Sequence, residues 1–115
     1  MKKSLILSLL ALATLSFLGC EKLSNKGTLI ITYLDESGNP KSATDVFLYV
    51  SKDNFDQAFY DEMTRTNGSG EATFDKLTEG NYYFDLTHRR GSITKTLSGN
   101  ADIVAGETTR VTLQP

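Results

Sequence analysis

The stretch NYYFDLT, residues 81–87, decides the fold. Two sets of side chains alternate along it: Tyr82, Phe84 and Leu86 in one, and Tyr83, Asp85 and Thr87 in the other. A period of two is typical of a β-strand, whose successive side chains point to opposite faces of the sheet. Because the first set is wholly apolar and the second is mixed, the stretch is predicted to be a half-buried strand.

Similar short runs recur along the chain between clusters of turn residues. The ranges that we expect to form strands are 28–34, 45–51, two runs within 65–74, then 81–87, 92–97, 101–104 and 108–113. Asn67-Gly68 separates the two runs within 65–74 and predicts a tight hairpin turn there. Seven or eight short strands spaced by about 8 to 12 residues are typical of an antiparallel sandwich. The chain is therefore predicted to be all-β.

The inward-facing positions of these runs predict the hydrophobic core. The run 45–51 is apolar on both faces, which indicates a central strand or one that is covered on its second side. The residues that we expect to be buried are Leu29, Ile31, Val46, Leu48, Val50, Ala72, Phe74, Leu77, Tyr82, Phe84, Leu86, Ile103, Val111 and Leu113.

One segment, between Ser51 and Met63, departs from the period of two. Phe55, Ala58 and Phe59 fall at positions i, i+3 and i+4, with Asp53 placed to cap the start, so a short helix is predicted after the second strand. We expect the helix to bury Phe55 and Phe59 against the sandwich, as is usual for such a stripe. The alternative, in which the two rings form a contact surface, stays open.

The order of motifs resembles a known group of domains. The motifs are Leu29-Ile30-Ile31, Gly38-Asn39-Pro40, Ala43-Thr44-Asp45-Val46, Thr66-Asn67-Gly68, Ala72-Thr73-Phe74, Leu77, Gly80-Asn81-Tyr82 and Gly106-Glu107-Thr108-Thr109. Over about residues 28 to 114 the chain resembles the carboxypeptidase regulatory-like and collagen-adhesin B-type repeat families. This resemblance implies an Ig-like or prealbumin-like sandwich. It implies little about activity, because a fold alone does not carry one.

The first 20 residues have the layout of an export signal. Lys2 and Lys3 precede an apolar stretch, residues 5–18, which is too short for the roughly 20 residues of a membrane span. The chain's single cysteine follows in Phe17-Leu18-Gly19-Cys20, which resembles a bacterial lipobox. A lone cysteine in an exported chain has no disulfide partner, which also favours lipidation over a free thiol.

This resemblance implies cleavage before Cys20, a diacylglycerol on its sulfur and an acyl group on its amino end. The expected organisation is a signal peptide at residues 1–19, the lipidated Cys20 with a polar tether at 20–27, and a β-sandwich domain at 28–115. Glu21 replaces the aspartate that signals inner-membrane retention in such lipoproteins, so the outer membrane of the bacterial cell envelope is the expected location. Several acyl chains together anchor a protein firmly.

Charge and residue content argue against several functions. Removal of residues 1–19 would leave 96 residues and, because two lysines and no acid are lost, would change the net charge from −2 to −4. An acidic domain has no electrostatic footprint for nucleic acid. One histidine and one cysteine cannot supply a zinc site, and the acids at residues 53–62 lack the spacing of a calcium loop. We expect no metal, no cofactor and no catalytic residue.

The predicted function is a non-catalytic, lipid-anchored envelope module that binds or presents an envelope protein or a glycan. The residues proposed as contacts, in loops at the strand ends, are Asn67, His88, Arg89 and Arg90. For the histidine and arginines, a solvated turn is the alternative. A second possible surface comprises the aromatic residues expected opposite the core: Tyr33, Phe47, Tyr49 and Tyr83. The alternative functions are a structural subunit of an envelope assembly and a small inhibitor of a secreted enzyme.

Overall fold

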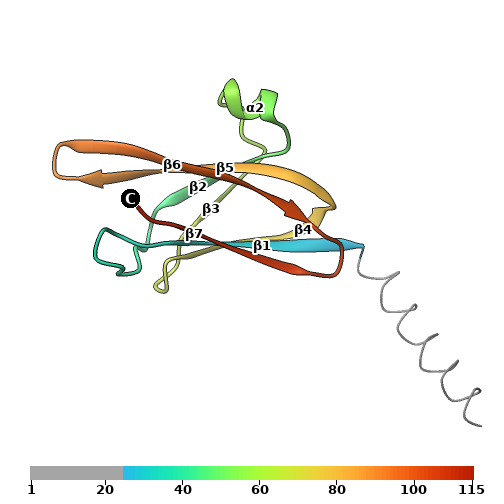
Figure 1. Cartoon of the computed structure of the whole chain (residues 1–115), viewed down its shortest axis with the longest axis horizontal. Helices are drawn as coiled ribbons and strands as arrows, with labels where there is room; N and C mark the ends of the chain where they lie inside the picture. Colours follow the sequence, from blue (N-terminus) through green and yellow to red (C-terminus); the bar gives the residue numbers. More distant parts are fainter. Residues whose placement is uncertain (1–24) are drawn as a thin grey trace, which may run out of the picture.

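The computed structural model describes residues 25–115, which form seven strands and one short helix (Figure 1). The elements are β1 (Lys26–Tyr33), β2 (Asp45–Tyr49), α2 (Lys52–Asp56), β3 (Glu62–Arg65), β4 (Glu71–Thr78), β5 (Gly80–Arg90), β6 (Ile93–Ile103) and β7 (Thr108–Leu113). The predicted signal peptide and Cys20 lie outside the described residues. Within residues 25–115, no helix is long and apolar enough to cross a membrane.

The strands form two sheets that enclose one core, which confirms the predicted all-β sandwich. The first sheet has the order β4-β1-β7 and the second has the order β3-β2-β5-β6. All neighbouring strands are antiparallel except β1 and β7, which run parallel with Ile31 opposite Val111. The predicted helix follows the second strand, as expected.

The core lies between the inner faces of the two sheets. Phe84 of β5 is fully buried, and its ring covers Gly99 of β6, where an added Cβ would lie 2.9 Å from the ring. The predicted core is confirmed with two exceptions: Val50 is 50% exposed, and Val111 is only partly buried. The sequence prediction omitted three residues that are buried: Tyr33, Tyr49 and Leu97.

Two strands are longer than the turn residues suggested. β5 runs on through His88, Arg89 and Arg90, which were expected to close it. β6 is one strand of 11 residues, Ile93–Ile103, where two short ones were predicted. Pairing explains both differences, because each residue of the hairpin from Arg90 opposite Ile93 to Gly80 opposite Ile103 has a partner in the ladder.

The predicted hairpin at Asn67-Gly68 is wrong. β3 and β4 belong to different sheets, so the segment between them crosses from one layer of the sandwich to the other. The positive φ angle in this turn belongs to Gly70, at 74°, and the Tyr33 N–H donates to the Gly70 carbonyl at 2.7 Å. An added Cβ on Gly70 would lie 2.7 Å from the Tyr33 carbonyl oxygen, so this close approach requires glycine.

The helix is shorter than predicted and begins differently. Ser51 is its N-cap and accepts a hydrogen bond from the Asn54 N–H at 3.1 Å, whereas Asp53 lies in the first turn. No residue of α2 is fully buried, and Phe59 beyond its end is 64% exposed, so the expected burial of Phe59 is wrong. Phe55 is half-buried.

The contrast between Phe84 and Val50 gives a test of this packing. Phe84→Ala is expected to lower the free energy of unfolding by about 3 to 5 kcal/mol, because it removes a fully buried ring. Val50→Ala is expected to change it by no more than about 0.5 kcal/mol, because half of that side chain faces solvent. Urea denaturation of both variants measures the difference, and a large loss in the Val50 variant would contradict the structure.

Candidate functional site

The outer face of the β3-β2-β5-β6 sheet, on the side away from the core, carries an unusual mixture of side chains. Along β2 and β5 the outward positions face each other in register, with Phe47 opposite Asp85 and Tyr49 opposite Tyr83. Alternation forces this arrangement, because the residues between them point into the core. We call this surface the outer face.

Aromatic rings cover the upper part of the outer face, where α2 lies over the sheet in Figure 1. Phe55 of α2 meets the ring of Tyr49 edge-on at a centroid distance of 5.2 Å and stacks on Tyr83 at 5.5 Å. Farther along, Tyr60 packs on Phe47 at 4.9 Å. Such ring pairs add stability beyond the area they bury. Phe55 therefore packs on the outer face, outside the core between the sheets.

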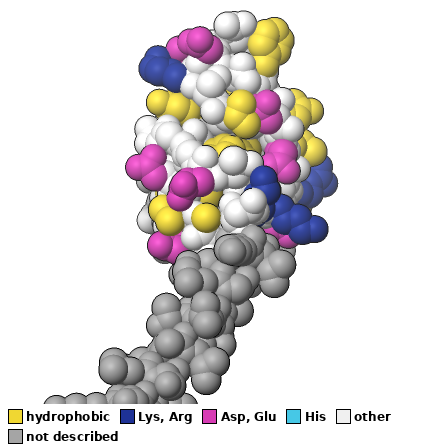
Figure 2. Space-filling view, turned by 90° about the vertical axis from the view of Figure 1, so that its right-hand side faces the viewer, with side chains coloured by type: hydrophobic (Ala, Val, Ile, Leu, Met, Phe, Trp, Pro, Cys, Tyr) yellow, Lys and Arg dark blue, Asp and Glu magenta, His cyan; other side chains and the backbone are white. Residues whose placement is uncertain are grey.

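Figure 2 shows the molecule from the end at which β1 begins, with exposed hydrophobic side chains at the top, near α2. More hydrophobic side chains lie lower on this end, and acidic and basic side chains are spread over all of it, the top included. Phe59 is 64% exposed and Tyr60 is 53% exposed, so the aromatic cluster reaches solvent.

Asp85 is a half-buried carboxylate among these rings. The Tyr49 hydroxyl donates a hydrogen bond to its Oδ1 at 3.1 Å. Burial raises the pKa of Asp85 above its ordinary value, and the hydrogen bond from Tyr49 only partly opposes this rise. Burial and the neighbouring carboxylate raise the pKa of Tyr49 to about 12. Tyr49 therefore stays protonated and keeps Asp85 oriented.

A stripe of exposed polar side chains runs along β6 beside the β5 residues. Four outward residues, Thr94, Thr96, Ser98 and Asn100, lie opposite Arg89, Thr87, Asp85 and Tyr83 of β5. Each offers a hydroxyl or amide that can donate and accept hydrogen bonds. We call these four residues the polar stripe.

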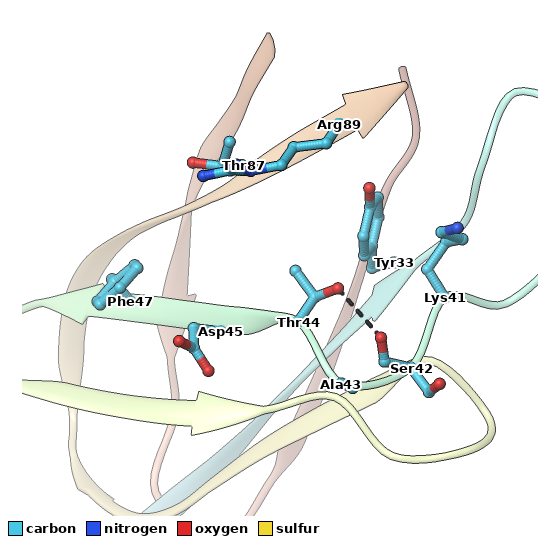
Figure 3. Close-up of a pocket in the computed structure, with 9 residues that line it drawn as sticks. All are labelled: Tyr33, Lys41, Ser42, Ala43, Thr44, Asp45, Phe47, Thr87 and Arg89. Atoms are coloured by element: carbon cyan, nitrogen blue, oxygen red, sulfur yellow. Dashed lines mark hydrogen bonds between the residues drawn. The ribbon is translucent and has the colours of Figure 1, made fainter. Parts of the chain in front are cut away.

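Two neighbouring hollows lie on this side of the molecule. The larger, of about 550 Å³, lies between Tyr33 at the end of β1, the segment before β2, and Thr87 and Arg89 of β5 (Figure 3). The smaller, of about 340 Å³, lies over the sheet and is lined in part by Tyr49, Tyr60 and Asp85. Phe47 and Thr87 line both hollows, so we treat them as one groove that crosses the outer face.

The residues predicted as contacts differ in how exposed they are. His88 is wrong as a contact residue, and the solvated-turn alternative is also wrong, because the side chain is only 5% exposed. It points inward from β5, where its Nδ1 shares a hydrogen bond with the Tyr33 hydroxyl. Its Nε2 closely contacts the Glu36 carboxylate without the alignment of a hydrogen bond.

This buried group joins the two sheets. Burial, with smaller contributions from Glu36 and Asp35, raises the pKa of Tyr33, so the tyrosine keeps its proton and can donate it to the Nδ1 of His88. A phenol held protonated is a poor nucleophile. We therefore assign Tyr33, His88 and Glu36 a structural role and call them the buried clasp.

The other predicted contacts lie at the same end of the sandwich but differ in availability. Arg89 lines the groove, whereas Arg90 pairs with Glu36 at 3.4 Å. The Asn67 side-chain Oδ1 accepts hydrogen bonds from the Ser69 and Glu71 N–H groups, at 2.9 and 3.1 Å, and so holds its own turn. Only Arg89 is both exposed and directed to the groove.

The predicted aromatic surface is correct in part. Phe47, Tyr49 and Tyr83 are on the outer face, whereas Tyr33 is 2% exposed and belongs to the core. The sequence analysis did not identify Asp85, Tyr60 or the polar stripe as site residues. The signal for Asp85 was its position among tyrosine and phenylalanine in an alternating strand, and that for the stripe was the alternation of Thr94, Thr96 and Ser98. Within residues 25–115, no three metal-ligating side chains gather.

No family model matches the chain, and no curated protein matches it. Solved structures do resemble it. The TIE protein of Bacillus anthracis superposes with a TM-score of 0.62 at 20% identity, over 78% of this chain and 16% of that one. The minor pilin GBS52 of Streptococcus agalactiae gives 0.58 at 16% identity, over 79% of this chain and 44% of that one.

A Pseudomonas aeruginosa protein described as a candidate carbohydrate-binding protein gives a TM-score of 0.57 at 15% identity. The match covers 80% of this chain and 90% of that one, whereas the chain spans less than half the length of the first two proteins. At such identities the likeness is one of fold. The chain has the β-sandwich fold of domains found in bacterial pilins and related proteins.

Asp85 gives a prediction about pH. Because its folded-state pKa lies above the ordinary 3.8, the folded protein holds this proton more tightly than the unfolded chain. The stability of the wild type relative to Asp85→Asn should therefore fall as the pH rises from 3.8 through the raised pKa, and stay level above it. Urea midpoints of both proteins across this range measure the effect. If the wild type instead gained stability relative to Asp85→Asn as the pH rose through this range, the prediction would be wrong.

Proposed function

We propose that the chain is a non-catalytic module of the bacterial cell envelope, anchored by lipid at Cys20, that binds glycan chains in the groove of the outer face. The observation that carries the proposal is a half-buried carboxylate, Asp85, held by Tyr49 between aromatic rings and a stripe of hydroxyls. Ligand sites combine apolar and aromatic walls with a few placed polar groups, as this groove does.

The chemistry of the groove matches that of a sugar. A pyranose ring has apolar C–H faces, which pack on aromatic rings, and equatorial hydroxyls at its edge, which pair with carboxylate and hydroxyl oxygens. Phe47 and Tyr60 supply the rings, and Asp85 supplies an acceptor for two hydroxyls. The polar stripe on β6 adds donors and acceptors along the same face.

The cost of Asp85 to the fold also supports a binding role. The raised pKa means that the ionised side chain is less favourable in the folded protein than in water. An uncharged residue on this strand would avoid that cost. Departures of this kind concentrate at functional sites, where the lost stability is exchanged for binding.

The comparisons support two parts of the proposal, the place at the cell envelope and the glycan as ligand. Neighbours of this fold include pilins, which supports a place at the cell surface. The neighbour covered over 90% of its own length is described as a candidate carbohydrate-binding protein, which supports the glycan as ligand. The leader and the lipobox at residues 17–20 support the anchor.

A second candidate function is that of a structural subunit in an envelope assembly. Among the described strands β6 pairs only with β5, so much of its outer edge offers unpaired backbone groups to another strand. Ile93 at the start of β6 is 67% exposed. Self-association of the purified domain, lost in Ile93→Glu, would favour this candidate.

The anchor is tested by Cys20→Ser in the native cell. The wild-type protein should fractionate with membranes and carry label from a radioactive fatty acid, since acyl chains partition into the bilayer. The variant should lose the label and either become free or stay unprocessed in the inner membrane. Normal processing and unchanged membrane fractionation of the variant would contradict the lipid anchor.

The binding face is tested with the soluble domain and neutral oligosaccharides such as chitohexaose, by calorimetry. Phe47→Ala should weaken binding about tenfold, the effect of losing about 1.4 kcal/mol of ring contact. Asp85→Asn, which keeps the shape of the side chain, should weaken it several-fold. Thr73→Ala, exposed on the other sheet, is the control. Equal affinities in all four proteins, with unchanged unfolding, would contradict the site.

A further inference from the structure

We infer that the glycan carries a protonated amine, and that the smaller hollow of the groove binds this ammonium group between the Asp85 carboxylate and the rings of Phe47 and Tyr60. This inference rests on the proposed function. It names the chemistry of one sugar in the ligand, an amino sugar whose nitrogen is not acetylated.

Asp85 lacks the donors that the other half-buried acids of residues 25–115 have. Asp45 and Glu71 each pair with an arginine, at 3.0 and 3.1 Å, and the Asp35 side chain accepts two backbone N–H groups, both at 2.9 Å. Asp85 receives a hydrogen bond only from the neutral hydroxyl of Tyr49, at its Oδ1. Its second oxygen, Oδ2, therefore remains an acceptor with no donor from residues 25–115.

No cation among residues 25–115 pairs with this carboxylate. Lys52 of α2 is held by Asp56 at 2.9 Å. The Arg89 side chain lies along β5 toward Thr87 (Figure 3), but it forms no ion pair with Asp85. Burial is the main influence on the pKa of Asp85, and no positive charge lowers it. A partly buried charge without a counter-ion is unfavourable, and a cationic ligand would supply the missing charge.

The rings beside Asp85 provide the other half of a cation site. Phe47 lies opposite Asp85 in the β2–β5 ladder, and Tyr60 packs on Phe47 at a centroid distance of 4.9 Å with its plane tilted by 57°. Both rings line the smaller hollow together with Asp85. The face of an aromatic ring attracts a cation within about 6 Å, and does so more strongly where water is partly excluded. One carboxylate and two rings around the same hollow therefore favour an ammonium group over a neutral hydroxyl.

The surroundings of the hollow favour an amine that is carried on a sugar. An amino sugar holds its nitrogen directly on a ring carbon, so the charge lies at the edge of the ring. The ammonium can then meet Asp85 while the C–H face of the same ring packs on Phe47, and Thr96 of the polar stripe lines the hollow beside them. A lysine side chain carries its charge on a flexible stem, which loses entropy when it is fixed.

Two hexasaccharides that differ by one acetyl group test the inference by calorimetry. They are chitohexaose and chitohexaose in which one inner sugar has lost its acetyl group, titrated at about pH 6, between the ordinary pKa values of aspartate and of amines. The deacetylated hexamer should bind about tenfold more tightly, as expected for one charge-assisted contact. Its advantage should shrink at high salt, because partly exposed charges are screened.

Two variants that each remove one negative charge assign the effect to a residue. Asp85→Asn should bind both hexamers with the same affinity, because the amide that replaces the carboxylate does not attract the ammonium. Asp75→Asn, at an exposed position of β4 in the other sheet, should keep the full difference between the hexamers.

A peptide separates the sugar amine from a lysine of a protein partner. A blocked hexaglycine peptide with one lysine in place of a glycine carries the same single charge as the deacetylated hexamer. It should bind at least about tenfold more weakly than that hexamer, because it brings no sugar ring to Phe47 and Tyr60.

The outcomes distinguish the inference from the function on which it rests. If chitohexaose binds the wild type and the deacetylated hexamer binds no more tightly, the inference is overturned while the glycan site stands. If neither hexamer binds the folded wild-type domain, the proposed function is overturned and the inference with it. If Asp75→Asn lowers the advantage as much as Asp85→Asn does, the attraction is general charge and the inference falls. It also falls if the lysine peptide binds as tightly as the deacetylated hexamer, because the occupant would then be a protein.

Discussion

The alternation of side chains along β5 is the constraint on which the rest of the structure depends. The strand contributes Tyr82, Phe84, Leu86 and His88 to the core side and Tyr83, Asp85, Thr87 and Arg89 to the outer face. Because the side-chain period of a strand is two, a slip of one residue would place Asp85 in the core and Phe84 in solvent. The energy that buries Phe84 therefore also keeps the groove facing outward.

The buried clasp connects this strand to the opposite sheet at the end where the groove opens. Tyr33 belongs to β1, and Glu36 follows it in the loop, so their contacts with His88 position that loop beside β5. Lys41 comes five residues after Glu36 along the same loop. A polar group buried between two sheets costs energy unless its partners are fixed, and it then specifies one arrangement. The clasp thus holds the loop before β2 beside β5, where the two segments line the larger hollow.

Periodicity predicted the fold because every second residue of each strand in a sandwich faces the core. The strands, the two-sheet architecture and most of the core follow from it. Long-range pairing, however, overrode local signals: the turn-like residues His88 to Arg90 are strand because β6 lies beside them, and Asn67-Gly68 links two sheets. Tyr33 was assigned to the outer face although its alternation with Leu29 and Ile31 places it on the core side, where its hydroxyl shares a hydrogen bond with His88, 55 residues away. The groove depends on residues from five segments, so no local pattern reveals it.

The direction of β1 relates the proposed anchor to the proposed site. The strand enters the domain at Lys26 and ends at Tyr33, which lines the larger hollow. Eight residues include seven rises of about 3.3 Å, which separate the two ends by about 23 Å. A lipid at Cys20 would therefore tether the end opposite Lys41 and Arg89. If a lipid holds this end of the domain at a bilayer, the larger hollow faces away from the headgroups. An anchor at the other end would place the hollow against the headgroups instead.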